Sequence, residues 1–341
     1  MIITAQSPCR VDLAGGTLDI WPLYLYHPGA VTVNFAVDRY TRCAIRPRSD
    51  RGIVLTSIDL KKSDVYSSLG SLLAAKKPAL GLHAWAIRHF SPYLSDAFGN
   101  GGFELETNSE APAGAGISGS SALLITVVSA FNKLCGTRYS IERVREVAQN
   151  IEAQIIRVPT GAQDYYPAMY GGVGALELRV DGLIRKAVEV DLDDFESRIV
   201  LAYTGVPRNS GINNWEVTKA HIDGDKKVHR NFERICAIAQ AMRVALSKSD
   251  WPEVARLLRE EWSHRRKNAP GIATPLIDRL IAVTGKRGAQ GAKVCGAGGG
   301  GCVFFLIEPG AKAAVTAAIE EEGATVLPVK VARRGVRVKT K

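Results

Sequence analysis

Alternating apolar and polar positions in the first third of the chain predict short β-strands. In these segments β-branched and aromatic residues recur with turn residues between them, which is the pattern of a half-buried strand. Four such strands are expected, at residues 31–37, 43–47, 53–58 and 103–107.

The hydrophobic period then changes from two residues to the longer repeat of helices. Residues 120–134 are apolar on most sides, which predicts a buried helix. Residues 141–156 are amphipathic, which predicts a helix with one solvent-exposed face. Because strands and helices come in runs, the fold class is α+β with two layers, and we expect a boundary between residues 1–185 and 186–341. The later predicted strands are 173–178, 199–203 and 302–307, and the later helices are 227–248, 252–265, 275–284 and 311–322.

The composition is that of an ordinary folded protein. With 341 residues, of which 46% are hydrophobic and 23% charged, the chain is neither disordered nor a small disulfide-stapled domain. The net charge is +10, but six of the basic residues lie in the acid-free tail at residues 330–341. That tail is expected to be a solvated edge strand with a frayed end, and no nucleic-acid partner is expected, because no aromatic residues interleave with its charges.

The six cysteines and the N-terminal segment carry no sorting or metal signal. The cysteines form no C-x-x-C pair, so neither zinc nor a disulfide framework is expected, and a reducing cytoplasm is the expected location. The first residues lack a signal-peptide pattern, and no apolar run is long enough for a membrane span. No membrane partner is therefore expected.

Two glycine-rich segments match G-x-G-x-x-G literally, which makes a dinucleotide-binding protein an alternative. One begins at Gly114 and the other at Gly296. That fingerprint requires a strand entering the loop, a helix leaving it and an acidic residue about 20 residues later. The first segment follows a loop and the second enters a strand, so both depart from it.

The segment PAGAGISGSSALL is better suited to holding phosphate. Its glycines allow close approach of the backbone, and the N–H groups of the following helix point at an anion. A nucleoside triphosphate is the expected ligand, although no Walker motif is present. A tight turn with a serine helix cap is the structural alternative.

Four segments in order, SPCRVDLAGGTLD, PAGAGISGSSA, VPTGAQDYYPAMYGG and GAKVCGAGGGGCVFF, resemble the motifs of the GHMP kinase superfamily of sugar, homoserine, mevalonate and phosphomevalonate kinases. The resemblance covers nearly the whole chain. It implies a two-domain fold, an N-terminal α+β domain with the phosphate loop and a C-terminal α/β-plait domain, with the active site between them. Among these kinases the chain is most similar to the D-glycero-D-manno-heptose 7-phosphate kinases, through AGGTLD, TGAQDYYPAMYGG, YTGVPRN and SHRRKNAPGIATPLIDRL.

The resemblance assigns roles to residues that carry phosphoryl transfer from ATP. Asp164 is the expected base and Arg10 the cation beside it, while Ser120 and Glu152 are the expected Mg²⁺ ligands. The second motif departs from the usual G-L-G-S-S, because Ser118 replaces a glycine and Gly119 a serine; this leaves Ser120 or Ser121 as the metal ligand. The nucleotide loop comprises Gly114, Ala115, Gly116, Ile117, Ser118, Gly119, Ser120 and Ser121.

The same resemblance implies an acceptor site for a sugar phosphate, phosphorylated at O1 for the synthesis of nucleotide-activated heptose in capsule, lipopolysaccharide or S-layer glycans. Another sugar 1-kinase, of the L-fucose or galactose type, and a non-catalytic relative are alternatives. Arg265, Arg266 and Lys267 are further candidates for the distal phosphate, although a solvated helix face explains most of that cluster. Oligomeric state is open between monomer and homodimer. The expected acceptor residues are Gly16, Thr17, Asp19, Gly298, Gly299 and Arg208.

Overall fold

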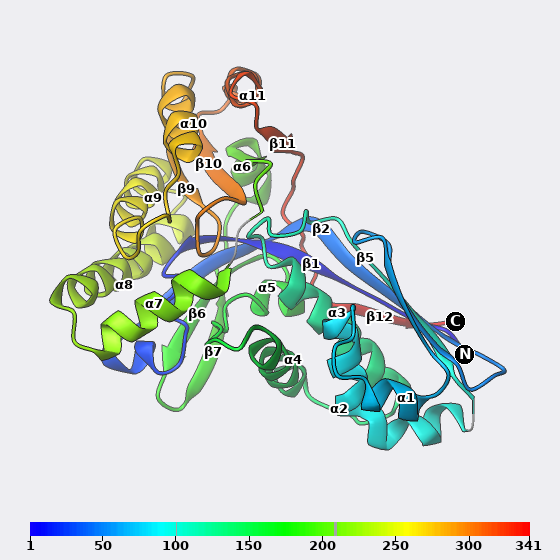
Figure 1. Ribbon diagram of the computed structural model, residues 1–341. Helices are drawn as coiled ribbons and strands as arrows, with labels where there is room; N and C mark the ends of the chain where they lie inside the picture. The colour runs from blue at the N-terminus through cyan, green and yellow to red at the C-terminus, as the bar shows by residue number, and fades with distance from the viewer. Residues whose placement is uncertain (100, 208–209) are drawn as a thin grey trace.

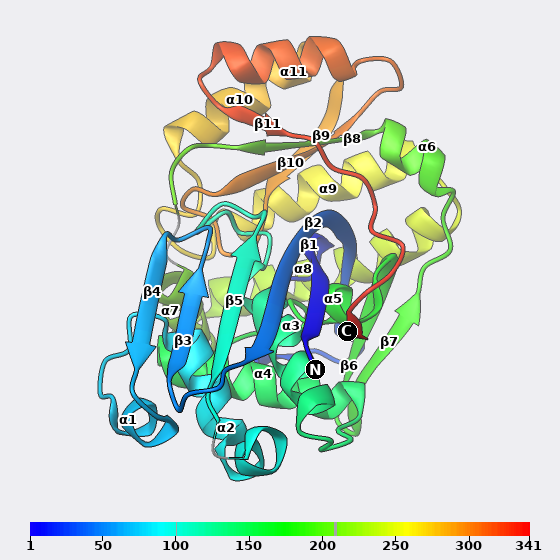
Figure 2. The same ribbon diagram turned by 90° about the vertical axis from the view of Figure 1, so that its right-hand side faces the viewer.

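The computed structural model describes residues 1–99, 101–207 and 210–341, and it contains two sheets (Figures 1 and 2). The larger sheet has eight strands. Its pairs are antiparallel except for the parallel pair formed by the strands at Ile53–Ser57 and Phe103–Ser109. Its strands are β1 (Ile3–Ala14), β2 (Val31–Pro47), β3 (Ile53–Ser57), β4 (Lys62–Tyr66), β5 (Phe103–Ser109), β6 (Val173–Arg179), β7 (Gly182–Ala187) and β12 (Arg337–Thr340).

The order of this sheet is β12-β1-β2-β5-β3-β4, with β6 joined to the other end of β2 and β7 to β6. The long strand β2 spans both of the strands expected at residues 31–37 and 43–47. Strand β1 pairs with it along its length, but the register shifts between Pro8 and Cys9 and again between Asp12 and Ala14. Such irregularities re-aim side chains, and here they bracket Arg10 and Asp12.

Helices cover one face of this sheet (Figure 1). The central one is α3 (Gly119–Leu134), which packs on β1 and β2 and is buried along most of its length, as its apolar sequence predicts. Helix α4 (Ile141–Ile156) packs on α3 through its apolar stripe. The other helical elements of this region are η1 (Leu23–Tyr26), α1 (Leu69–Ala74), α2 (Gly81–Phe98) and α5 (Tyr166–Tyr170).

The smaller sheet contains β9 (Ala289–Val294), β8 (Ile199–Tyr203), β10 (Cys302–Ile307) and β11 (Thr325–Leu327), in the order β11-β8-β10-β9. Helices α10 (Pro275–Gly285) and α11 (Lys312–Glu321) lie on its outer side, and α9 (Trp251–Arg265) lies on the side that faces the large sheet (Figure 2). The remaining helices are α6 (Leu192–Ser197), α7 (Ser210–Ile222) and α8 (Lys226–Ser247).

Helices α8 and α9 also contact β1, so the two sheets share a packed interface. The predicted division at residues 185 and 186 falls within β7, and it stays a prediction. The edge strand expected in the tail is confirmed as β12, which pairs with β1 at the sheet edge. The predicted frayed end is corrected, because the backbones of Lys341 and Ile2 exchange hydrogen bonds. No helix in the described residues is long and apolar enough to cross a membrane.

Candidate active site

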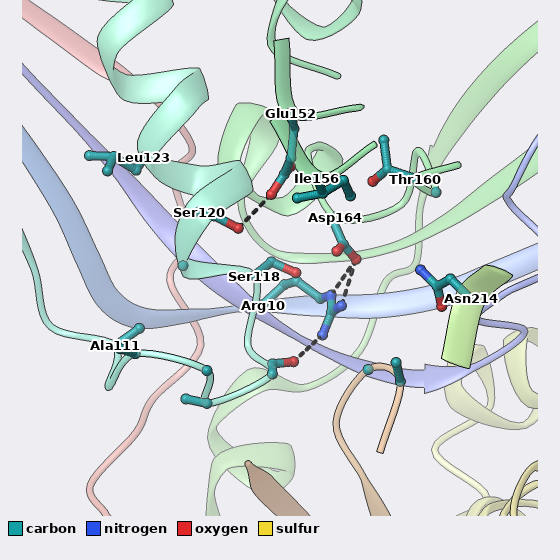
Figure 3. Close-up of a pocket in the computed structure, with 18 of the residues that line it drawn as sticks. Arg10, Ala111, Ser118, Ser120, Leu123, Glu152, Ile156, Thr160, Asp164 and Asn214 are labelled. Carbon is teal, nitrogen blue, oxygen red and sulfur yellow. Dashed lines mark hydrogen bonds and ion pairs between the residues drawn. The ribbon is translucent and has the colours of Figure 1, made fainter. Parts of the chain in front are cut away.

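A pocket of about 380 Å³ lies where β1, the start of α3, the end of α4 and the two glycine-rich loops meet (Figure 3). One end lies at Ala111 and Leu123 and is apolar (Figure 3). Leu60, Leu82 and Ile156 also line the pocket. The other end, at Arg10, Asp164 and Asn214, is polar (Figure 3). Thr17, Asp19, Gln163, Arg265 and Gly296 also line the pocket. A flat apolar group with a charged tail would match these two ends.

The first glycine-rich loop also lines the pocket. Gly114, Gly116 and Ser118 have φ angles of 68°, 80° and 59°, so the chain turns through left-handed conformations before α3 begins. The N–H groups of the first turn of a helix have no partner within it, and the helix dipole adds positive potential there. The loop therefore offers backbone donors to an anion.

The second glycine-rich loop supports the first from behind. A Cβ on Gly301 would lie 2.7 Å from the carbonyl oxygen of Ala115, and the backbone N–H of Cys302 donates to that oxygen at 2.7 Å. No side chain fits between the two loops, which explains a glycine at residue 301.

Asp164 and Arg10 form an ion pair at the polar end. The Nε and Nη2 atoms of Arg10 donate to Oδ1 of Asp164 at 3.0 and 2.5 Å, and Nη1 donates to the carbonyl of Gly116 at 2.8 Å. Burial lowers the pKa of Arg10, but the carboxylates of Asp164 and Asp12 raise it overall. The guanidinium stays charged and joins the aspartate to the phosphate loop.

Asp12, which the sequence analysis did not single out, lies at the centre of a buried charge network. Its carboxylate accepts hydrogen bonds from Lys293 and from the backbone of Gly296, and it contacts Arg10 at 3.4 Å. Burial raises the pKa of Asp12, and Lys293, Arg10 and Arg265 more than offset this, so it lies well below its usual range. A polar residue two positions from Arg10 on a strand shares its face, and that spacing was the available signal.

Glu152 and the first turn of α3 form a second polar group. Glu152 Oε1 accepts a hydrogen bond from Ser120 at 2.5 Å, and Oε2 accepts from Ser121 at 2.8 Å and from Tyr165 at 2.5 Å. Burial raises the pKa of Glu152, although the three hydroxyl donors oppose this. Tyr165 was also missed; it directly follows Asp164 in the sequence.

These oxygen atoms suit Mg²⁺, which favours carboxylate and hydroxyl ligands and keeps several waters. Ser120 is exposed and lines the pocket, whereas Ser121 is buried and does not line it. This favours Ser120 with Glu152 as the protein ligands. Within the described ranges no group of three or more His, Cys, Asp or Glu residues is suited to a metal.

Asp19 reaches the polar end beside Asp164. Its carboxylate accepts a hydrogen bond from the backbone N–H of Gln163 at 2.8 Å. A Cβ on Gly161 would lie 2.0 Å from the same oxygen, so a side chain there would displace the Asp19 carboxylate. Burial, helped by the charge of Asp164, raises the pKa of Asp19 to about 6. The carboxylate is placed to accept hydrogen bonds from an acceptor molecule.

Several expected acceptor residues occupy other places. Gly16, Gly298 and Gly299 do not line the pocket: a Cβ on Gly298 would meet Ile272 at 2.7 Å, which indicates a packing role. Thr17 does line it. Arg208 lies outside the described residues. Of the second glycine-rich loop, Gly296 and Ala297 line the pocket, and direct contact of Gly298 and Gly299 with the substrate stays a prediction.

The arginines of the basic cluster at residues 265–267 lie in different surroundings. Arg265 is buried, lines the pocket and pairs with Glu261, and its Nη2 donates to the carbonyl of Gly16 at 3.0 Å. Arg266 pairs on the surface with Asp278. A solvated face was expected for most of this cluster, and Arg265 is the member that is buried.

Comparisons with known proteins agree with this geometry. The chain matches the family models of the GHMP kinase N-terminal domain at residues 82–172 and of the C-terminal domain at residues 242–325. It is 26% identical over 348 residues to a D-glycero-alpha-D-manno-heptose 7-phosphate kinase of Campylobacter jejuni, with 98% of each chain covered.

Two solved structures have the same fold. One is a D-glycero-D-manno-heptose 1-phosphate kinase from Bacteroides thetaiotaomicron, with a TM-score of 0.79, 24% identity and 99% of both chains covered. The other is a Lactococcus lactis galactokinase in complex with galactose, with a TM-score of 0.80, 20% identity and coverage of 98% of this chain and 95% of that one. The pocket, its paired Arg10 and Asp164, and the matched models together show that this chain belongs to the GHMP kinases.

Proposed function

We propose that the protein is an ATP- and Mg²⁺-dependent sugar kinase that phosphorylates O1 of D-glycero-D-manno-heptose 7-phosphate. The observation that carries the proposal is the meeting, in one pocket, of the Arg10–Asp164 pair with Ser120 and Glu152. The similarity to the Campylobacter heptose phosphate kinase supports the choice of acceptor. The product would serve nucleotide-activated heptose synthesis for capsule, lipopolysaccharide or S-layer glycans.

The apolar end of the pocket suits the adenine base of ATP, and the loop at residues 114–121 suits its phosphates. Mg²⁺ held by Ser120 and Glu152 would supply charge neutralisation at the phosphate oxygens. The acceptor then lies at the polar end, where Asp19 accepts hydrogen bonds from sugar hydroxyls.

The chemical step follows from the position of Asp164. Its carboxylate accepts the proton of the acceptor hydroxyl as that oxygen bonds to the γ-phosphorus, while the bond from phosphorus to the bridging oxygen breaks and ADP leaves with that electron pair. Arg10 holds the carboxylate in place and offsets negative charge on the transferring group.

The polar end also constrains how a sugar phosphate would bind. Asp12, Asp19, Asp164 and Glu261 bring four carboxyl groups near the three cations Arg10, Arg265 and Lys293. This balance favours neutral sugar hydroxyls over a dianion, so the 7-phosphate is expected to point outward, away from Asp164.

A substrate panel tests the proposal. Coupled ADP release would be measured with heptose 7-phosphate, L-fucose, galactose, mannose and mevalonate, each with and without EDTA. The proposal predicts metal-dependent turnover with the heptose phosphate as the best acceptor. A free hexose as the better acceptor would favour the galactose or L-fucose type, for which the galactokinase fold likeness is the supporting observation.

A further inference from the structure

Ser118 occupies the N-cap position of α3 but does not cap the helix. A serine at this position normally has extended backbone angles, and its oxygen accepts an N–H from the first turn. Here φ is 59° and ψ is 37°, which is left-handed, and the side chain makes no cap hydrogen bond. The hydroxyl is therefore turned away from the helix backbone.

The hydroxyl of Ser118 is also buried without a partner. The residue is 6% exposed, and its Oγ atom has no hydrogen-bond partner among the described residues. A buried hydroxyl that makes no hydrogen bond destabilises the folded state, because the bond that it made to water is lost. A glycine at residue 118 would avoid both the left-handed strain and the unpaired hydroxyl.

The direction of the side chain indicates where its partner belongs. Ser118 lines the pocket, and Figure 3 shows its hydroxyl pointing into the space between Ser120 with Glu152 on one side and Arg10 with Asp164 on the other. The first group suits the metal and the second the acceptor. A group that transfers between nucleotide and acceptor has to pass through this space.

We propose that the Ser118 hydroxyl donates a hydrogen bond to the γ-phosphate of bound ATP. Strain and an unpaired polar atom at one pocket residue are the features expected of a group that gains its partner on ligand binding. A hydrogen bond to a phosphate oxygen is charge-assisted and stronger than one between neutral groups. The proposal rests on the nucleotide half of the proposed function and does not depend on the sugar.

Two substitutions separate the hydroxyl from the backbone. Ser118→Ala removes the hydroxyl and keeps a Cβ atom on the left-handed backbone. Ser118→Gly removes the hydroxyl and the Cβ atom. Each variant is expected to lower kcat/KM by roughly 10- to 100-fold, since that is the worth of a hydrogen bond to a charged group. Neither is expected to lower the melting temperature, and Ser118→Gly is expected to raise it.

Ser249→Gly is the matched control. Ser249 is also a serine with left-handed φ, at 52°, but it is exposed after α8 and outside the pocket. This variant is expected to leave kcat/KM unchanged, so that any loss at residue 118 is not a general effect of placing glycine in a left-handed turn.

Nucleotide binding in the absence of the acceptor sugar identifies the phosphate that Ser118 contacts. The rise in melting temperature caused by a non-hydrolysable ATP analogue should be smaller in Ser118→Ala than in the parent protein, while the rise caused by ADP should be unchanged. Because no sugar is present, this result stands even where the acceptor assignment fails.

Three results would overturn the proposal. Turnover within about twofold of the parent in both Ser118 variants would show that the hydroxyl binds nothing in the reaction. A lower melting temperature in Ser118→Ala would make the hydroxyl a structural group. Equal losses of the ADP and ATP-analogue shifts would place the contact on the α- or β-phosphate instead.

Discussion

Lys293 on β9 donates a hydrogen bond to the carboxylate of Asp12 on β1, and neither side chain is exposed to solvent. The pair joins the small sheet to the large one beside Arg10, which also contacts Asp12. Removing one partner of a buried ion pair leaves an uncompensated charge, which typically costs about 3–5 kcal/mol. The charge network is therefore expected to stabilise the interface that forms the pocket.

Lys293→Met should reduce the free energy of unfolding by about this 3–5 kcal/mol, measured by urea denaturation. The double variant with Asp12→Asn should lose less stability than the sum of the two single variants. With both charges removed, neither residue leaves a buried charge without its partner. Lys219→Met, at the exposed pair with Asp223, is the control and should leave stability nearly unchanged. Additive losses at Asp12 and Lys293 would show that the pair is not coupled.

Asp164→Asn should lower kcat by at least about 10²-fold, because the amide cannot accept the proton of the acceptor hydroxyl. Binding of an ATP analogue, followed by its effect on the melting temperature, should change little, since Asp164 is placed at the acceptor end. Near-native kcat in this variant would mean that Asp164 only anchors Arg10.

Glu152→Gln should raise the Mg²⁺ concentration needed for half-maximal turnover by about 10- to 100-fold, because a neutral amide is a poorer ligand. Tyr165→Phe removes one of the two donors to Oε2 and leaves the contacts with Ser120 and Ser121 in place, so it should have a smaller effect. Titrating Mg²⁺ at fixed ATP compares them. An unchanged Mg²⁺ requirement in Glu152→Gln would remove this carboxylate from the metal site.

Asp19 should make stability depend on pH. Its pKa of about 6 in the folded protein lies above the ordinary value of 3.8, so the folded state binds more protons than the unfolded state between these values. Its contribution to stability is then greatest below about pH 4 and is lost as the pH rises through 6. As the pH rises through this window, the melting temperature of Asp19→Asn should therefore rise relative to that of the parent. Parallel plots of melting temperature against pH for the two proteins would contradict the raised pKa.

About half of the regular elements could be predicted from the hydrophobic period, whereas others, β1 among them, were missed. The predicted helix at residues 141–156 coincides with α4, and the predicted strands at 53–58 and 302–307 coincide closely with β3 and β10. Helix α2 was missed because Pro92 lies within it and its sequence mixes aromatic and polar residues. Strand β7, with largely unburied residues at the end of the sheet, has no apolar pattern to detect.

Part of the candidate site could also be predicted from the sequence, through motifs instead of the hydrophobic period. Arg10, Ser120, Glu152 and Asp164 were found through motifs, and the structure brings them to one pocket. Lys293 could not be found, because a lysine is normally exposed and its burial depends on carboxylates from other elements. The unpaired hydroxyl of Ser118 likewise depends on a backbone angle that local sequence does not specify.

The most direct test of the account is the position of the new phosphate. The protein would be incubated with ATP, Mg²⁺ and D-glycero-D-manno-heptose 7-phosphate, and the product examined by phosphorus NMR. The account predicts one new anomeric phosphate at O1, with the 7-phosphate retained, and at least about 100-fold slower formation by Asp164→Asn. A phosphate on any other oxygen, or no product while a free hexose is phosphorylated, would contradict the proposed acceptor.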